Sequence, residues 1–90
     1  MTINDGIKKF RLPSHSTLED LECGFGIRVL TFGDKVLVAG YYYNGEKSYY
    51  GAVYEFLTDD TSCEGEIGLY AVSDVEFEDN GHAIQWAMQQ

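Results

Sequence analysis

Alternation of apolar and polar side chains is the feature that most constrains this fold, and it dominates the chain from Phe25 onward. A period of two sends successive side chains to opposite faces of a β-strand. The pattern predicts strands at Phe25–Phe32, Lys35–Tyr43 and about Glu66–Val72. The second of these is rich in β-branched and aromatic residues, which favour strands.

Two-residue turn signals join these strands into hairpins. Gly33-Asp34 follows the first strand and Asn44-Gly45 follows the second. Asn-Gly is the strongest short hairpin signal, because a type I′ turn needs positive φ at both central residues. Pairing across Asn44-Gly45 places residues at equal distances from the turn opposite each other: Tyr43 opposite Glu46, Tyr41 opposite Ser48, Ala39 opposite Tyr50 and Leu37 opposite Ala52.

A second Asn-Gly dipeptide, Asn80-Gly81, predicts a last hairpin that pairs Phe77 with Ile84 and Val75 with Trp86. The competing interpretation makes residues 82–90 a helix with Ala83, Trp86 and Ala87 on one face. Both patterns fit so short a segment, and the strand is preferred.

The N-terminal third contains the clearest helix signal of the chain. Ser16-Thr17-Leu18-Glu19 has the pattern of a capping box, and Leu18 and Leu21 share a helical face. Residues 1–12 alternate weakly around Phe10 and are interpreted as an edge strand. The expected fold is therefore a single acidic, β-rich α+β domain over residues 1–90. It is an antiparallel meander of five to six strands with one short helix near residues 16–23.

The charge of the chain is strongly unbalanced. Six Lys and Arg stand against 15 Asp and Glu among 90 residues, which gives a net charge of −9 at pH 7. Nonspecific binding to nucleic acid or to an anionic membrane is not expected, because such binding depends on cationic side chains. No apolar stretch of membrane-spanning length and no signal peptide is recognised, so a cytoplasmic location is expected.

Acidic residues are concentrated between Glu55 and Asp79, a segment without Lys or Arg. Asp74, Glu76 and Glu78 alternate with apolar residues, so on a strand their carboxylates would form a row about 6.5–7 Å apart. The row is either a solvated face that keeps the protein soluble or a contact surface for a basic partner. The residues expected to contact a partner are Asp59, Asp60, Glu64, Glu66, Asp74, Glu76, Glu78, Asp79, Tyr43 and Tyr50.

No motif predicts catalysis or a bound group. His15, Cys23, Cys63 and His82 stand singly and lack the spacing of a zinc site. Asp60–Gly65 has part of the pattern of a calcium loop, but Ala71 stands where a bidentate Glu belongs. We expect no cofactor, no metal and no enzymatic activity.

In size and charge, although in no motif, the chain resembles the small acidic proteins that phages use against host defences. These include anti-CRISPR proteins, anti-restriction proteins and other DNA mimics. The resemblance implies a viral inhibitor whose acidic face blocks a basic, nucleic-acid-binding surface of a host protein, such as an enzyme or a larger complex.

The alternative is a β-rich protein-binding or assembly module that uses the tyrosine-rich hairpin, residues 41–54. The acidic residues would then serve solubility alone. Tyrosine is enriched in binding surfaces because it offers a large rigid area with a polar tip. A homodimer formed through an exposed strand edge is compatible with this interpretation.

Overall fold

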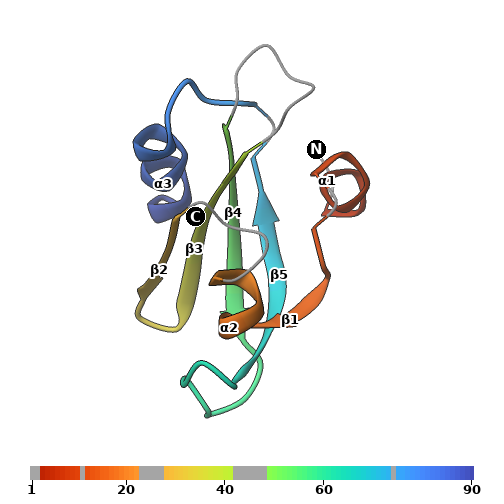
Figure 1. The fold of residues 1–90 in the computed structure, drawn as a ribbon, viewed down its shortest axis with the longest axis vertical. Coiled ribbons are helices and arrows are strands. Elements are labelled where there is room, and N and C mark those ends of the chain that lie inside the picture. Colours follow the sequence, from red (N-terminus) through yellow and green to blue (C-terminus); the bar gives the residue numbers. More distant parts are fainter. Residues whose placement is uncertain (1–2, 11, 23–27, 42–48, 74) are drawn as a thin grey trace.

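The computed structural model describes residues 3–10, 12–22, 28–41, 49–73 and 75–90. Its centre is a five-stranded antiparallel sheet in the order β1-β5-β4-β3-β2 (Figure 1). The strands are β1 (His15–Thr17), β2 (Arg28–Phe32), β3 (Lys35–Tyr41), β4 (Tyr49–Phe56) and β5 (Glu66–Val72). Within these residues, three short helices accompany the strands: α1 (Ile3–Phe10), α2 (Leu18–Asp20) and α3 (Asn80–Met88). The expected mainly β, α+β architecture is confirmed.

Both faces of the sheet are covered, because side chains of β3 alternate between two apolar clusters. Val36 and Val38 point to a cluster that contains residues of α1 and α2, whereas Leu37 and Ala39 point to a cluster that contains residues of α3. The sheet therefore separates α1 and α2 from α3. None of the helices in the described ranges is long and apolar enough to cross a bilayer.

The turn at Gly33-Asp34 joins β2 to β3 as predicted. Gly33 has a φ of 65°, the positive value that the first central residue of a primed hairpin turn needs. Phe32 consequently lies opposite Lys35, and the pairing continues to Arg28 opposite Ala39.

The predicted register between β3 and β4 is wrong by one residue. Tyr41 lies opposite Tyr49 rather than Ser48, and Leu37 lies opposite Val53 rather than Ala52. A shift of one residue moves a whole strand to the other face. The observed register places Val36 beside Tyr54 and so unites the apolar side chains of one face. The Asn44-Gly45 turn itself lies outside the described residues.

The N-terminal segment is a helix and not the predicted edge strand. Gly6 and Phe10 are one helical turn apart and face the sheet together. A Cβ on Gly6 would lie 2.7–2.9 Å from side-chain atoms of Val72, and the ring of Phe10 stacks on Tyr50. Close packing of α1 against β5 thus overrides the weak alternation of the sequence.

The C-terminal segment is also a helix, so the hairpin predicted at Asn80-Gly81 is wrong and the competing helix is confirmed. Asp79 is the N-cap, and its Oδ1 accepts a hydrogen bond from the backbone N–H of His82 at 2.8 Å. Ala83, Ile84 and Ala87 are buried against the sheet. The helix thus buries three apolar side chains in the cluster formed with Leu37, Ala39 and Val53.

Helix α2 is shorter than the helix predicted near residues 16–23, and its cap is displaced by one residue. Thr17, rather than Ser16, is the N-cap, and its Oγ1 accepts from the backbone N–H of Asp20 at 3.2 Å. Ser16 is engaged in β1, where it pairs with Ile67 of β5. Pairing of β1 with β5 therefore fixes where α2 begins.

Candidate functional site

The loop between β4 and β5, residues 57–65, places several predicted contact residues at one end of the sheet (Figure 1). Asp59, Asp60 and Glu64 are all exposed on it. The loop is held by short hydrogen bonds: Ser62 donates its backbone N–H to Asp60 Oδ1 at 3.0 Å, and Gly65 donates to the Ser62 carbonyl at 3.0 Å. A side chain at position 65 would collide with the Asp60 carbonyl. These contacts give the acidic loop a defined shape.

Helix α2 lies directly beside this loop. The backbone N–H of Glu19 donates to the Cys63 carbonyl at 3.0 Å, and Thr17 pairs with Glu66 across β1 and β5. The two exposed acids of α2, Glu19 and Asp20, are thereby brought to the same end of the molecule as the loop. We call this surface the acidic end, and it consists of Glu19, Asp20, Asp59, Asp60, Glu64 and Glu66.

A shallow pocket of about 250 Å³ lies within the acidic end. Asp20 and Glu66 line it together with three residues of β1, namely His15, Ser16 and Thr17. Residues from α2, β1 and β5 therefore meet at one concave surface. The pocket is thus lined by two hydroxyl side chains, one imidazole and two carboxylates.

The charges of the acidic end are not neutralised within the described part of the chain. Ion pairs within the described residues form at other acids: Glu76 pairs with Lys9 at 3.4 Å, Glu55 with Lys35 at 3.3 Å, and Asp79 with His82 at 2.9 Å. No carboxylate of the acidic end pairs with a Lys or Arg among the described residues. An unpaired cluster of like charges produces a concentrated negative field at this end.

Asp60 is ionised over a wider pH range than an ordinary aspartate. Hydrogen bonds from the Ser62 side chain, and next from its backbone N–H, lower the pKa of the Asp60 carboxyl below its usual value of 3.8. The cause is that these donors stabilise the charged form. Negative charge on the loop therefore persists under mildly acidic conditions.

The acids that precede α3 lie at the opposite end of the sheet (Figure 1). The predicted strand carrying Asp74, Glu76 and Glu78 is wrong: residues 75–79 form a connecting segment, with a single bridge between Phe77 and Tyr49. Glu76 pairs with Lys9, Asp79 caps α3, and only Glu78 of the described acids here has neither role. Asp74 itself lies outside the described residues.

Of the two tyrosines in the predicted contact set, the described one, Tyr50, is buried. Tyr50 is only 3% exposed, and its ring stacks on Phe10 with centroids 4.3 Å apart and an angle of 11° between the planes. The prediction that Tyr50 lies at a contact surface is wrong, because alternation along β4 directs this side chain into the core. Tyr43 lies outside the described residues.

Glu19 and Asp20 are the members of the acidic end that sequence reasoning missed. They are far from the acidic loop in the chain, and the pairing of β1 with β5 brings them together. The local signal was present, since two acids follow the capping threonine in the first helical turn. What the sequence lacks is any local sign that β1 pairs with β5.

The arrangement favours an extended cationic ligand over a single metal ion. No three His, Cys, Asp or Glu side chains within the described ranges converge as metal ligands. The carboxylates of the acidic end instead spread over a loop, a helix and a strand. Such a surface can bind several Lys or Arg side chains at once.

A family model described as "nucleotide modification associated domain 4" (Nmad4) matches residues 12–90, which include the whole sheet, α2 and α3. No curated protein and no solved structure shows a significant match to the chain.

Proposed function

Because the chain belongs to the nucleotide modification associated domain 4 family, we propose that it is a binding protein of a nucleotide-modification system. Its acidic end docks on a basic, nucleic-acid-binding surface of a protein in that system. The chain itself carries out no reaction. By occupying a surface built for phosphates, it acts as an inhibitor of the DNA-mimic type.

The observation that carries this proposal is the unpaired charge of the acidic end. Six carboxylates from α2, the β4–β5 loop and β5 lie at one end of the sheet, whereas Glu76, Glu55 and Asp79 elsewhere pair with Lys9, Lys35 and His82. Concentrating like charge costs stability, so a partner that supplies the cations would relieve that cost. A groove that binds a phosphate backbone supplies such cations.

The family description also narrows the partner. Its words associate the domain with nucleotide modification, so an enzyme that modifies nucleotides in nucleic acid is favoured over a CRISPR complex or a restriction enzyme. Such an enzyme must hold the nucleic acid backbone, which requires a basic surface.

The test begins with affinity capture on the immobilised chain at 50 and 300 mM salt, followed by purification of the captured protein. We expect a nucleic-acid-binding protein whose affinity for the chain falls at the higher salt. In a competition assay, DNA and the chain should exclude each other from that protein. Simultaneous binding of both, or an affinity unchanged by salt, would contradict the proposal.

Two matched glutamate variants localise the contact. Glu64→Lys reverses a charge in the acidic end, and Glu78→Lys makes the same change at an exposed position at the opposite end. We expect Glu64→Lys to weaken binding roughly tenfold, about 1.4 kcal/mol, and Glu78→Lys to leave it nearly unchanged. An equal loss in both variants would show that net charge, and not this surface, determines binding.

A further inference from the structure

We propose that two copies of this chain associate through the outer edge of β2. Their β2 strands pair antiparallel about a two-fold axis that places Thr31 opposite Thr31 of the partner copy. The two sheets then form one continuous sheet of ten strands. This association does not depend on the proposed function, because β2 belongs to no part of the acidic end.

Strand β2 is the more vulnerable edge of the sheet. It has a strand neighbour only on the side of β3 within the described residues, whereas the other edge strand, β1, is just three residues long. Proteins usually protect an edge by shortness, by proline or by a lysine that projects from it. β2 has five residues, no proline and no lysine, and it exposes Leu30 by 38% and Phe32 by 59%.

The backbone of β2 leaves a defined set of groups unpaired in this sheet. Phe56 donates its N–H to the Asp34 carbonyl, so in β3 the residues with even numbers face β4 and those with odd numbers face β2. The residues of β2 opposite them are Arg28, Leu30 and Phe32. The N–H and C=O groups of Val29 and Thr31 therefore point outward, where a further strand can pair with them.

This alternation restricts how two β2 strands can meet. Only outward-facing residues can exchange hydrogen bonds, so Thr31 can lie opposite Thr31 or Val29 of the partner copy, but not opposite Leu30. With Thr31 opposite Thr31, Leu30 lies opposite Phe32, and Arg28 lies beyond the end of the partner's β2, beside the turn that contains Asp34. Each of these pairs occurs twice because of the two-fold axis.

The side chains favour this register over the one that places Val29 opposite Thr31. Arg28, Leu30 and Phe32 project from the same face, since each lies opposite a residue of β3 on the α3 side. The Thr31 register therefore joins an apolar pair, Leu30 with Phe32, to an ion pair, Arg28 with Asp34. The alternative register would set Arg28 against the ring of Phe32 and leave Asp34 without a cation.

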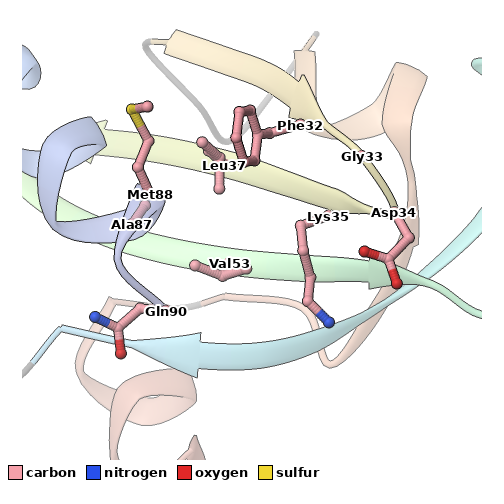
Figure 2. Close-up of a pocket in the computed structure, with 9 residues that line it drawn as sticks. All are labelled: Phe32, Gly33, Asp34, Lys35, Leu37, Val53, Ala87, Met88 and Gln90. Atoms are coloured by element: carbon pink, nitrogen blue, oxygen red, sulfur yellow. The ribbon is translucent and has the colours of Figure 1, made fainter.

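The face that would be shared is apolar beyond the strand itself. Phe32 and Met88 border a pocket of about 240 Å³ whose floor consists of Leu37, Val53 and Ala87 (Figure 2). Phe32 and Met88 are more than half exposed. Bringing Leu30 of the partner copy against Phe32 removes part of this apolar surface from water.

Sedimentation equilibrium of the full chain over a range of concentrations tests the association. Only a short edge is buried, so we expect a weak dimer, and the mass should rise from 10.1 kDa toward twice that value at roughly tens to hundreds of micromolar protein. A mass that stays at the monomer value throughout this range would overturn the proposal.

Two charge variants test the register. Arg28→Asp replaces the cation beside the Asp34 turn of the partner copy by a carboxylate, so like charges meet twice in the dimer. Asp34→Arg sets two guanidinium groups against each other in the same way, so each variant alone should be monomeric. In an equimolar mixture, one copy of each variant can pair two carboxylates on one chain with two guanidinium groups on the other. A heterodimer should therefore form about as tightly as the unaltered dimer. Both variants keep a large net negative charge, so general attraction between them cannot produce this result.

The control replaces Asp34→Arg by Glu64→Arg, which changes the net charge equally but lies outside β2. Mixed with Arg28→Asp, it keeps only one of the two attractive contacts, so its heterodimer should be much weaker than that of the charge-swapped pair. Thr31→Pro removes an outward N–H at an edge position that tolerates proline, and it should abolish dimers while the circular dichroism spectrum is retained. A heterodimer with the control as tight as that of the charge-swapped pair, or dimers of Thr31→Pro at the unaltered affinity, would contradict pairing through β2.

Discussion

At the scale of single residues, Tyr50 shows how the interior of this small protein is assembled. Its ring stacks on Phe10 of α1 and approaches Gly40 so closely that a Cβ there would collide with it. Burial raises the pKa of the Tyr50 hydroxyl from 10.0 to about 12, because a phenolate would have to form away from water. Tyr50 therefore ties α1 to the sheet as a neutral side chain.

This predicts a specific alkaline weakness. The unfolded chain loses the Tyr50 proton near pH 10, whereas the folded chain holds it to about pH 12. Stability from this group is complete below pH 10 and is lost as the pH rises through that window. Tyr50→Phe removes the ionisable group and keeps the stacked ring, so the variant should lose about 1 kcal/mol less unfolding free energy than the unaltered chain between pH 8 and pH 11.

Urea unfolding followed by far-ultraviolet circular dichroism at pH 8 and pH 11 measures this difference. Subtracting the loss of one protein from that of the other removes the contribution that the other tyrosines make to both, including that of Tyr54, whose pKa burial also raises. An equal loss in both proteins would mean that Tyr50 ionises as easily in the folded state as in the unfolded one.

At the scale of elements, α3 depends on its N-terminal cap. Asp79 accepts from the His82 backbone N–H, and this bond is the first cause that lowers the pKa of its carboxyl below the ordinary 3.8. A carboxylate at this position also interacts favourably with the helix dipole. The ionised carboxylate of Asp79 therefore stabilises α3.

Replacing the cap should destabilise the protein in a manner that depends on pH. We expect Asp79→Ala to lower the melting temperature at pH 7, and Asp79→Asn to lower it less, because asparagine retains an acceptor oxygen. The stabilisation is present above pH 3.8 and disappears as the pH falls through the lowered folded pKa. Thermal melts at pH 7 and at pH 2.5 measure the difference between each variant and the unaltered chain. A difference that persists undiminished at pH 2.5 would exclude the charged cap as its cause.

The elements also show which parts of the fold were open to prediction from sequence. Strand β5 has the bounds that the alternation of apolar and polar residues predicts. The hairpin at Gly33-Asp34 joins neighbouring strands, so it too could be predicted from a short-range pattern. The segment from 75 to 90 is compatible with a hairpin or a helix when considered alone. Long-range contacts decide it: α3 lies so close to β4 that a Cβ on Gly51 would lie 2.7 Å from the ring of Trp86.

The candidate site divides in the same way. Asp59, Asp60 and Glu64 belong to one polar loop and could be grouped from the sequence. Glu19 and Asp20 join them only through the pairing of β1 with β5, which no local pattern indicates. The register between β3 and β4 failed for a related reason, since the match of apolar faces across the sheet selects it rather than the nearest turn dipeptide.

At the scale of the whole molecule, cationic side chains among the described residues balance the negative charge at one end of the sheet and not at the other. The segment before α3 has its Glu76 matched by Lys9 at 3.4 Å, while the acidic end has no such match within the described residues. Electrostatic repulsion should therefore oppose folding at the acidic end, and electrostatic attraction should support it at the other.

Neutral substitutions at the two ends should consequently have opposite signs. Asp59→Asn with Glu64→Gln removes repulsion and should raise the unfolding free energy, whereas Glu76→Gln breaks an ion pair and should lower it, each by less than about 1 kcal/mol at low salt. Both changes should shrink when the salt concentration is raised to about 0.5 M, because the Debye length then falls to about 4 Å and interactions between exposed charges are strongly screened. Urea titrations at two salt concentrations measure all four values. If neutralising the acidic end destabilised the chain, its carboxylates would have partners that offset their repulsion, and the driving force for docking on a basic surface would be absent.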